Sequence, residues 1–286
     1  MASRFFARFG NLCVCYEGDL SLLEGTLLDR FADVEQAPAI TISLRRAQLA
    51  QAPKAPCEFE SINTRVWHLP DGTWHRRYSA VYAGERREYA AMNYCENRAE
   101  LTIAPICQNT ARAVEGCVAF EHLAICAGSL PIHASHIQTQ FGSLVFTGPS
   151  GIGKSTQAAL WEKTAKILNG DKTLLQLEQG EIFAASIPYC GTSDICHRGG
   201  GKLAAIVVLE QAKENHVQQL HAAQAVSQLM ASVIRNPWHR DDAQRALELA
   251  AQIAQRVPIY KLRCVPNETA VHCLRTVLEK GGAEFG

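Results

Sequence analysis

The spacing of apolar and polar residues changes near residue 115, and this change predicts two differently built parts. Before it, short runs such as residues 40–44 and 65–69 alternate between apolar and polar side chains, which is typical of strands with one buried face. A turn at Pro70-Asp71-Gly72 separates the second run from residues 74–82, so a hairpin is expected there. The first part is therefore predicted to be β-rich.

After this point, longer amphipathic segments alternate with short apolar runs, which is the pattern of an α/β domain. The segments expected to be helices are residues 117–127, 222–233, 241–257 and 268–279. The runs expected to be strands are residues 132–137, 143–147, 174–177, 182–184, 203–209 and 259–262. We therefore divide the chain into a β-rich N-terminal domain, residues 1–115, and an α/β domain, residues 116–286.

The most specific motif of the chain is a glycine-rich loop that fits the P-loop or Walker A pattern G-x-x-x-x-G-K-S/T. It consists of Gly148, Pro149, Ser150, Gly151, Ile152, Gly153, Lys154, Ser155 and Thr156. A predicted strand precedes it and a helix-compatible segment, residues 154–165, follows it, which is the context that nucleotide-phosphate binding requires. Lys154 would reach the β- and γ-phosphates, and the Ser155 hydroxyl would ligate magnesium. A purely structural glycine-rich turn would match this pattern only by chance.

Composition and charge fit an enzyme-sized soluble chain. The sequence has 28 Lys and Arg against 28 Asp and Glu, so its zero net charge gives no indication of nucleic acid or an anionic membrane as a partner. The eleven cysteines are scattered along the chain, and the nearest pair, Cys13 and Cys15, has no second pair at the spacing of a zinc site. This favours reduced thiols in a cytoplasmic protein. No signal peptide and no membrane-spanning run is apparent.

Two residues near the glycine-rich loop are candidates for chemistry. Asp171 ends a short apolar stretch after the predicted loop helix, where a returning strand could bring a carboxylate toward magnesium. His133 lies on a predicted strand before the loop. From position alone both residues have a plain alternative, because a lone Asp is often a cap and a lone His is usually structural.

At these positions the sequence resembles a known superfamily. The segments Ile132-His133-Ala134-Ser135, GPSGIGKST and Asn169-Gly170-Asp171-Lys172 occur in the order and approximate spacing of the HPr serine kinase and phosphoenolpyruvate carboxykinase superfamily. The chain looks most similar to bacterial HPr-kinase-like proteins that include the kinases of peptide-modifying gene clusters. The resemblance covers residues 117–280 well. It implies a phosphoenolpyruvate carboxykinase-like α/β fold with a P-loop core, preceded by a smaller β-rich domain.

The resemblance also implies roles for the two candidates. Asp171 would match the carboxylate that contacts magnesium and takes the proton from the attacking hydroxyl, and His133 would match the histidine near the γ-phosphate and the metal. Relatives typically have two adjacent aspartates, whereas Asp171 is followed here by Lys172. This departure argues against a second carboxylate-held metal and against carboxykinase chemistry, and Lys172 could instead neutralise phosphate charge.

The segment 188–202 is a candidate substrate-binding loop. Its glycine run, residues 199–201, predicts mobility, while Arg198 and Lys202 could meet an anionic group and Asp194 could support the metal. A plain flexible connection fits the same residues equally well.

The leading hypothesis is an ATP-dependent kinase that uses Mg²⁺ and phosphorylates a hydroxyl, on a serine of a protein or peptide. One alternative is an ATPase, in which Glu210 at the end of an apolar run would position water, or a kinase of a small metabolite. The other is a nucleotide-binding protein with reduced catalysis, which the missing second aspartate would explain. The sequence identifies neither the acceptor nor the oligomeric state, and a homo-oligomer is compatible with it.

Overall fold

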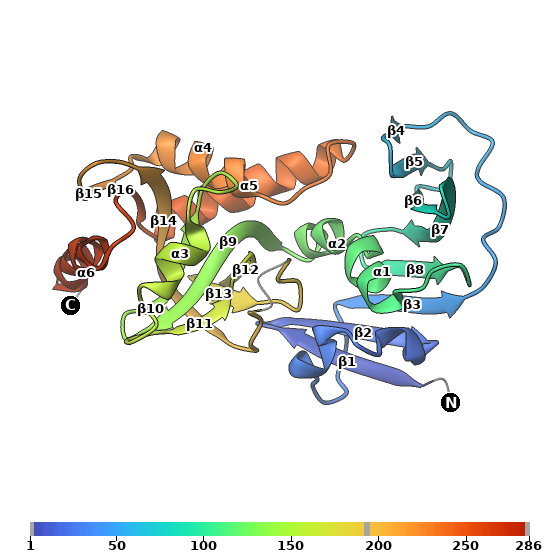
Figure 1. The fold of residues 1–286 in the computed structure, drawn as a ribbon, viewed down its shortest axis with the longest axis horizontal. Coiled ribbons are helices and arrows are strands. Elements are labelled where there is room, and N and C mark those ends of the chain that lie inside the picture. The colour runs from blue at the N-terminus through green and yellow to red at the C-terminus, as the bar shows by residue number, and fades with distance from the viewer. Residues whose placement is uncertain (1–2, 192–194, 284–286) are drawn as a thin grey trace. The chain divides into compact units, whose positions relative to one another are not determined.

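The computed structural model describes residues 3–191 and 195–283 and shows a mixed α/β protein with two large sheets (Figure 1). The chain separates into two compact units. The first comprises Met1–Arg8, Leu12–Ala127 and Asn236–Arg240, and the second comprises the remaining segments. The expected boundary between residues 115 and 116 falls inside a helix of the first unit. Of the helices described, none is both long enough and apolar enough to cross a membrane.

The first unit is β-rich, as its alternating pattern predicts. Within the described residues its sheet has the strand order β1-β2-β3-β8-β7-β6-β5-β4. These strands are β1 Arg4–Phe9, β2 Leu12–Gly18, β3 Ile40–Arg46, β4 Phe59–Glu60, β5 Thr64–His68, β6 Trp74–Tyr82, β7 Glu85–Tyr94 and β8 Arg98–Ile103. The helical segments are η1 Leu20–Leu23, η2 Leu27–Phe31, α1 Thr110–Cys117 and α2 Phe120–Cys126. The predicted hairpin is confirmed by the antiparallel pairing of β5 with β6.

The helix predicted over residues 117–127 is confirmed as α2, but it begins only at Phe120, and a separate helix, α1, precedes it. The chain becomes extended at Val118, whose ψ is 125°. The backbone N–H of Ala119 then donates to the Met92 sulfur instead of continuing a helix. Gly116, which has a low helix propensity, lies in the last turn of α1, just before the break.

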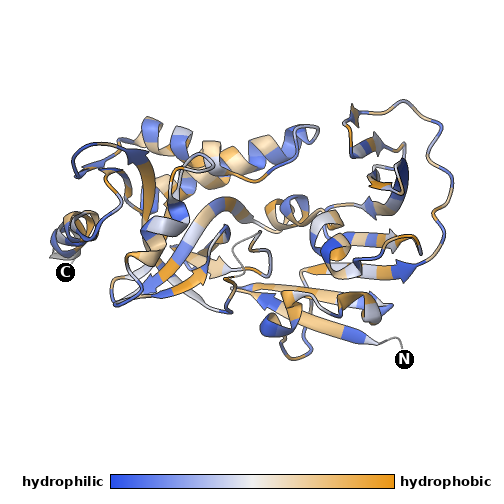
Figure 2. Ribbon diagram, viewed as in Figure 1, coloured by the Kyte–Doolittle hydropathy of each residue, from blue (hydrophilic) through white to orange (hydrophobic). Residues whose placement is uncertain are grey.

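The second unit contains the remaining elements. Its strands are β9 Ser129–Thr139, β10 Gly142–Thr147, β11 Lys166–Asn169, β12 Lys172–Glu178, β13 Glu181–Ser186, β14 Gly200–Gln211, β15 His216–Gln219 and β16 Ile259–Cys264. Its helices are α3 Lys154–Ala159, α4 Ala222–Ser232, α5 Arg240–Arg256 and α6 Glu268–Ala283. Hydrophilic and hydrophobic residues are mixed along α4 and α5 in Figure 2, as expected for helices with one buried face.

Two long strands close the second sheet into a ring. The first half of β9 pairs with β12 and its second half pairs with β10. The start of β14 pairs with β13, and its middle part pairs in parallel with β10. The strands β10-β9-β12-β13-β14 therefore form a closed circuit of pairings, from which β16 and β15 extend beyond β14.

The apolar run predicted at residues 143–147 is β10, the central strand of this unit. Leu144, Val145 and Phe146 are completely buried, which explains why the run does not alternate. Leu144 and Phe146 belong to a hydrophobic cluster that also contains Trp161, which lies just after the end of α3. The helix after the loop is shorter than predicted, because α3 ends at Ala159 and Trp161 lies in the following turns.

The prediction of a mobile loop through the glycine run at residues 199–201 is wrong, because β14 already begins at Gly200. A Cβ atom at Gly200 would lie 2.2 Å from the Ala184 carbonyl oxygen. Glycine is therefore required here for the close approach of β14 to β13.

A buried histidine lies in the ring of strands. His136 on β9 is fully buried, and its Nε2 lies 2.9 Å from the Ser143 hydroxyl. Since that hydroxyl donates its own proton to Gln138, Nε2 carries the imidazole proton and Nδ1 has no partner. Burial lowers the pKa of His136 to about 3. A second proton would place a charge in a site without an acceptor.

We expect this histidine to make the fold sensitive to mild acid. An unfolded histidine has a pKa near 6.5, so its stabilising effect is complete above that pH and is lost as the pH falls toward 3. Between pH 7 and pH 5 the loss is about 2 kcal/mol in the free energy of unfolding. His136→Gln keeps a donor for Ser143 and removes the titrating group. Urea denaturation at both pH values should show a smaller pH dependence for the variant, and equal dependence would contradict this expectation.

Candidate functional site

The glycine-rich loop connects the carboxyl end of β10 to α3. Gly148, Gly151 and Gly153 have φ angles of 143°, 77° and 107°, in a region that favours glycine. A Cβ atom at Gly148 would lie 3.3 Å from the Leu209 carbonyl oxygen. The loop closes on itself through Ile152, whose N–H donates to the Pro149 carbonyl. Such a path leaves a concave backbone surface, which is the kind that binds anions.

Lys154 supplies the positive charge of this loop. Its ammonium group donates to the carbonyl oxygens of Gly148 and Pro149, at 3.0 and 3.1 Å. It is therefore folded over the loop rather than extended into solvent. Ser155 and Thr156 are exposed in the first turn of α3, where their hydroxyls are accessible.

Asp171 lies between β11 and β12, and its backbone is held in place by neighbouring residues. The buried side chain of Asn169 accepts hydrogen bonds from the N–H groups of Asp171 and Lys172, each 2.9 Å long. The carbonyl of Asp171 accepts a hydrogen bond from the Ala134 N–H on β9, 2.8 Å long. The carboxylate itself takes no part in these bonds. They fix the backbone of Asp171 and leave its carboxylate oxygens available.

Two more residues support this position. The Ser135 hydroxyl donates to the Gly170 carbonyl over 2.9 Å. A Cβ atom at Gly191 would lie 2.7 Å from Oδ2 of Asp171, so a glycine makes room for the carboxylate there. Sequence reasoning assigned no role to Asn169, Ser135 or Gly191. Ser135 and Asn169 stand in the segments that resemble the kinase superfamily, and this resemblance was the only signal for them.

Strand pairing brings His133 close to Asp171 and to the loop. His133 on β9 lies opposite Lys172 on β12, and the next residue, Ala134, lies opposite Thr147 at the end of β10. The Thr147 hydroxyl donates to the His133 carbonyl, which ties β9 to the start of the loop.

The charges around His133 show that these groups lie within electrostatic reach of one another. The side chain is exposed overall, yet the protein atoms around the ring lower its pKa. The Asp171 carboxylate opposes this shift, whereas Lys172 and Lys154 add to it. At neutral pH the imidazole is therefore uncharged and can accept as well as donate a hydrogen bond.

The candidate substrate residues lie in different places. Lys172 is half-buried, and its charge helps to lower the pKa of His133. Arg198 is exposed in a segment whose backbone is bonded beside β11, since His197 N–H donates to the Leu168 carbonyl. The Lys202 ammonium pairs with Glu181 on β13. Asp194 lies outside the described residues.

Glu210, the alternative acid, lies at the end of β14 and is engaged by two cations. Lys261 donates to one carboxylate oxygen at 3.1 Å, and Arg263 donates to the other at 2.7 Å. The hydrogen bonds from these two side chains lower the pKa of Glu210. Its strand flanks β10 on one side, and β9 with His133 flanks it on the other.

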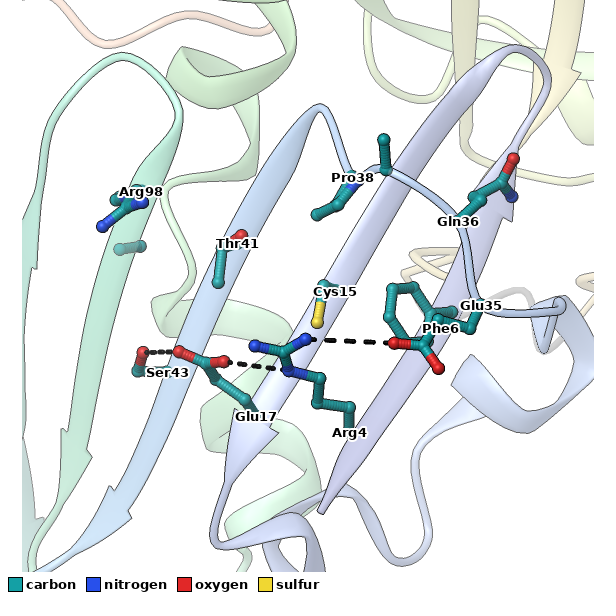
Figure 3. A pocket seen from close by; sticks show the side chains of 12 residues that line it. Arg4, Phe6, Cys15, Glu17, Glu35, Gln36, Pro38, Thr41, Ser43 and Arg98 are labelled. Atoms are coloured by element: carbon teal, nitrogen blue, oxygen red, sulfur yellow. Dashed lines mark hydrogen bonds and ion pairs between the residues drawn. The ribbon is translucent and has the colours of Figure 1, made fainter. Parts of the chain in front are cut away.

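A cleft of about 590 Å³ opens in the first unit, over β1, β2, β3 and β8 (Figure 3). Its charged side chains are partly paired, because Arg4 lies 3.5 Å from Glu17 and 3.9 Å from Glu35. Burial raises the pKa of the Cys15 thiol on the wall, so this cysteine stays protonated and unreactive at neutral pH.

Comparison with known proteins gives two findings. The model of the family described as SynChlorMet cassette protein ScmC matches residues 113–267, which include the loop, Asp171 and the end of β14. The solved HPr(Ser) kinase/phosphatase from Coxiella burnetii is similar with 14% sequence identity and a TM-score of 0.33. That similarity covers 54% of this chain and 96% of the other. No curated protein matches the chain.

Proposed function

The chain belongs to the family of SynChlorMet cassette protein ScmC, and we propose that it is an ATP-dependent kinase that phosphorylates a serine of a protein or peptide. One observation carries this proposal. The glycine-rich loop with Lys154 follows directly after β10. On the adjacent strand β9, His133 pairs with Lys172, the residue next to Asp171. A phosphate-binding loop beside a fixed, unneutralised carboxylate is the arrangement that phosphoryl transfer to a hydroxyl requires.

The loop and Lys154 would hold the phosphates. Backbone N–H groups of the concave loop would donate to the β- and γ-phosphate oxygens, and the Lys154 ammonium would leave its two carbonyl partners to join them. The Ser155 hydroxyl and the Asp171 carboxylate are hard oxygen ligands of the kind that Mg²⁺ prefers, so both would hold that ion. When bound, Mg²⁺ neutralises charge on the phosphates.

Asp171 would act on the acceptor. The serine oxygen attacks the γ-phosphorus, its proton passes to the Asp171 carboxylate, and the bond to the β–γ bridging oxygen breaks to release ADP. His133, uncharged and beside Asp171, would donate a hydrogen bond to a γ-phosphate oxygen. Lys172 would compensate phosphate charge where relatives carry a second aspartate.

The acceptor peptide also needs a binding site, and we propose that the first unit provides it. The outer edge of β1 is partly occupied, because Ala7 bridges to Ala32 and the Asp33 N–H donates to the Phe6 carbonyl. Addition of a peptide strand at that edge is therefore restricted. The cleft in Figure 3, whose open polar lining includes Arg98 and Thr41, offers hydrogen-bonding groups instead.

The ATPase alternative is weaker for a specific reason. To position water, the Glu210 carboxylate would have to lie beside the γ-phosphate and accept a proton or a hydrogen bond from that water. Both oxygens of Glu210 are already engaged by Lys261 and Arg263, and this residue lies on the opposite side of β10 from His133.

The test is to incubate the protein with γ-labelled ATP, Mg²⁺ and an extract of its host, and to identify the labelled species by mass spectrometry. We expect phosphoserine in a protein or peptide. Labelled inorganic phosphate alone would favour an ATPase, and a labelled small metabolite would keep the kinase but exclude the peptide acceptor. Binding of ATP without any turnover would leave only the nucleotide-binding alternative.

A further inference from the structure

We propose that the first unit contains a zinc site, with His122, Cys126 and His239 as its three protein ligands. The side chains come from two segments of that unit, the helix α2 and the stretch Asn236–Arg240. Thiolate sulfur and imidazole nitrogen are donor atoms that Zn²⁺ takes in proteins. The proposed phosphoryl transfer uses none of these residues, so this inference does not rest on the proposed function.

The first two ligands lie one helical turn apart. His122 and Cys126 are four residues apart in α2, and residues at this spacing share one face of a helix. The Cys126 sulfur lies 3.7 Å from Nε2 and 4.0 Å from Nδ1 of His122. Tetrahedral zinc, with bonds of about 2.3 Å to sulfur and 2.0 Å to nitrogen, places two such donor atoms about 3.5 Å apart. The pair is therefore already close to the spacing of two ligands of one zinc ion.

His239 brings the third donor. Its ring stacks on that of His122, with the two centroids 4.3 Å apart and the planes at 20°. One imidazole nitrogen of each residue lies within 4.8 Å of one nitrogen of the other. Because the planes are nearly parallel, one ring has to turn about its Cβ–Cγ bond to direct both lone pairs at the same ion. This torsion has a broad range in histidine, so the turn needs no change of the backbone.

Tyr94 determines which nitrogen of His239 faces the ion. The Tyr94 hydroxyl lies 2.8 Å from Nε2 of His239, and it also accepts a hydrogen bond from the Trp238 indole at 3.4 Å. With Nε2 engaged by this hydroxyl, Nδ1 is the donor for the metal. An outer hydrogen bond of this kind orients most histidines that ligate metals.

Burial keeps the imidazoles in the state that a metal ion requires. His122 and His239 are only 6% and 4% exposed. Burial, followed by the charge of His122, lowers the pKa of His239 to about 3. At neutral pH the ring of His239 is therefore uncharged, as a ligand of a cation must be. Cys126 is half-buried, so an ion can reach the site from its side. Bound zinc would join α2 to residues 236–240 and stabilise the first unit.

A zinc titration of the full chain tests the site, after treatment with EDTA and in an excess of Mg²⁺ that occupies sites made of oxygen ligands. We expect one strong zinc site per chain and a melting temperature that rises when zinc is added. With Co²⁺ in place of Zn²⁺ we expect a thiolate-to-cobalt charge-transfer band in the near ultraviolet, which requires a cysteine ligand.

Three variants and one control assign the ligands. Cys126→Ser should abolish the band and weaken zinc binding by at least about 100-fold, since the loss of an outer hydrogen bond alone costs ~10–100-fold. His239→Gln should weaken zinc binding to a similar extent and keep the band. Tyr94→Phe should weaken it about tenfold, also with the band retained. Cys57→Ser is the matched control, because Cys57 is an exposed thiol of the same unit, and it should bind zinc like the wild type.

Absence of zinc binding by the wild type would overturn the site. Binding that Cys126→Ser and His239→Gln leave unchanged would also overturn it, because zinc would then be held by other residues. If Cys126→Ser does not fold, the wild type still decides, since a cobalt spectrum without the charge-transfer band excludes the thiolate ligand. The labelled-ATP assay tests the proposed kinase separately from all of these results.

Discussion

Lys154→Ala is expected to weaken ATP binding by about 10- to 100-fold and to abolish phosphoryl transfer. Lys154 is the only charged residue of the sequence between positions 148 and 156, so the variant leaves the loop itself without a side-chain cation. Hydrogen bonds to charged groups contribute about 1.5–3 kcal/mol, which sets the loss of affinity. Turnover should fall further, by at least ~10³-fold, because the same cation meets the charge that develops in the transition state. Calorimetry and single-turnover assays with labelled ATP measure the two effects.

Lys163→Ala is the control for this substitution. Lys163 lies in the same unit and pairs with Glu268 at 3.1 Å, but both side chains are largely exposed, so the pair adds little to stability. This variant should bind ATP and turn over like the wild type. If Lys154→Ala keeps full affinity and full turnover, the loop does not bind phosphates, and the proposed function loses its basis.

Local sequence patterns predicted the loop and its strand well, for reasons visible in the structure. Residues 144–146 are uniformly apolar because β10 is buried on both faces, and the glycines of the loop have the positive φ angles that the motif indicated. The strands expected at residues 174–177 and 182–184 are also confirmed, and they pair as a local hairpin with a two-residue turn at Gln179-Gly180.

What the sequence could not reveal depends on contacts between distant segments. Position alone left Asp171 and His133 open, since their proximity results from the pairing of β9 with both β10 and β12. Periodicity does not show which buried amides form hydrogen bonds, so Asn169 could not be singled out. The mobile loop expected at residues 199–201 was wrong because the requirement for glycine comes from β13, a partner that the local pattern does not show.

Asp171→Asn is expected to lower turnover by at least ~10²-fold while the protein stays folded. The hydrogen bonds that hold this residue involve its backbone N–H and carbonyl, and the amide occupies the same space beside Gly191. Asparagine loses the basicity that would accept the serine proton and the charge that would hold Mg²⁺. The variant should therefore require more Mg²⁺ for half-maximal activity, in addition to its lower maximal rate. Circular dichroism melting and a Mg²⁺ titration of the labelled-ATP assay separate these effects from misfolding.

Glu210→Gln is the matched change of a carboxylate to an amide on the other side of β10. It removes the charge that Lys261 and Arg263 neutralise, but it leaves Asp171 and the loop unchanged. In the proposed function Glu210 takes no part in the transfer, because it lies on the other side of β10 from His133, so the substitution should leave the maximal rate nearly unchanged. The opposite result, with turnover lost in Glu210→Gln and retained in Asp171→Asn, would place the γ-phosphate on the β14 side. In that case Glu210 would be the water-positioning acid of an ATPase, and the role proposed for Asp171 would be wrong.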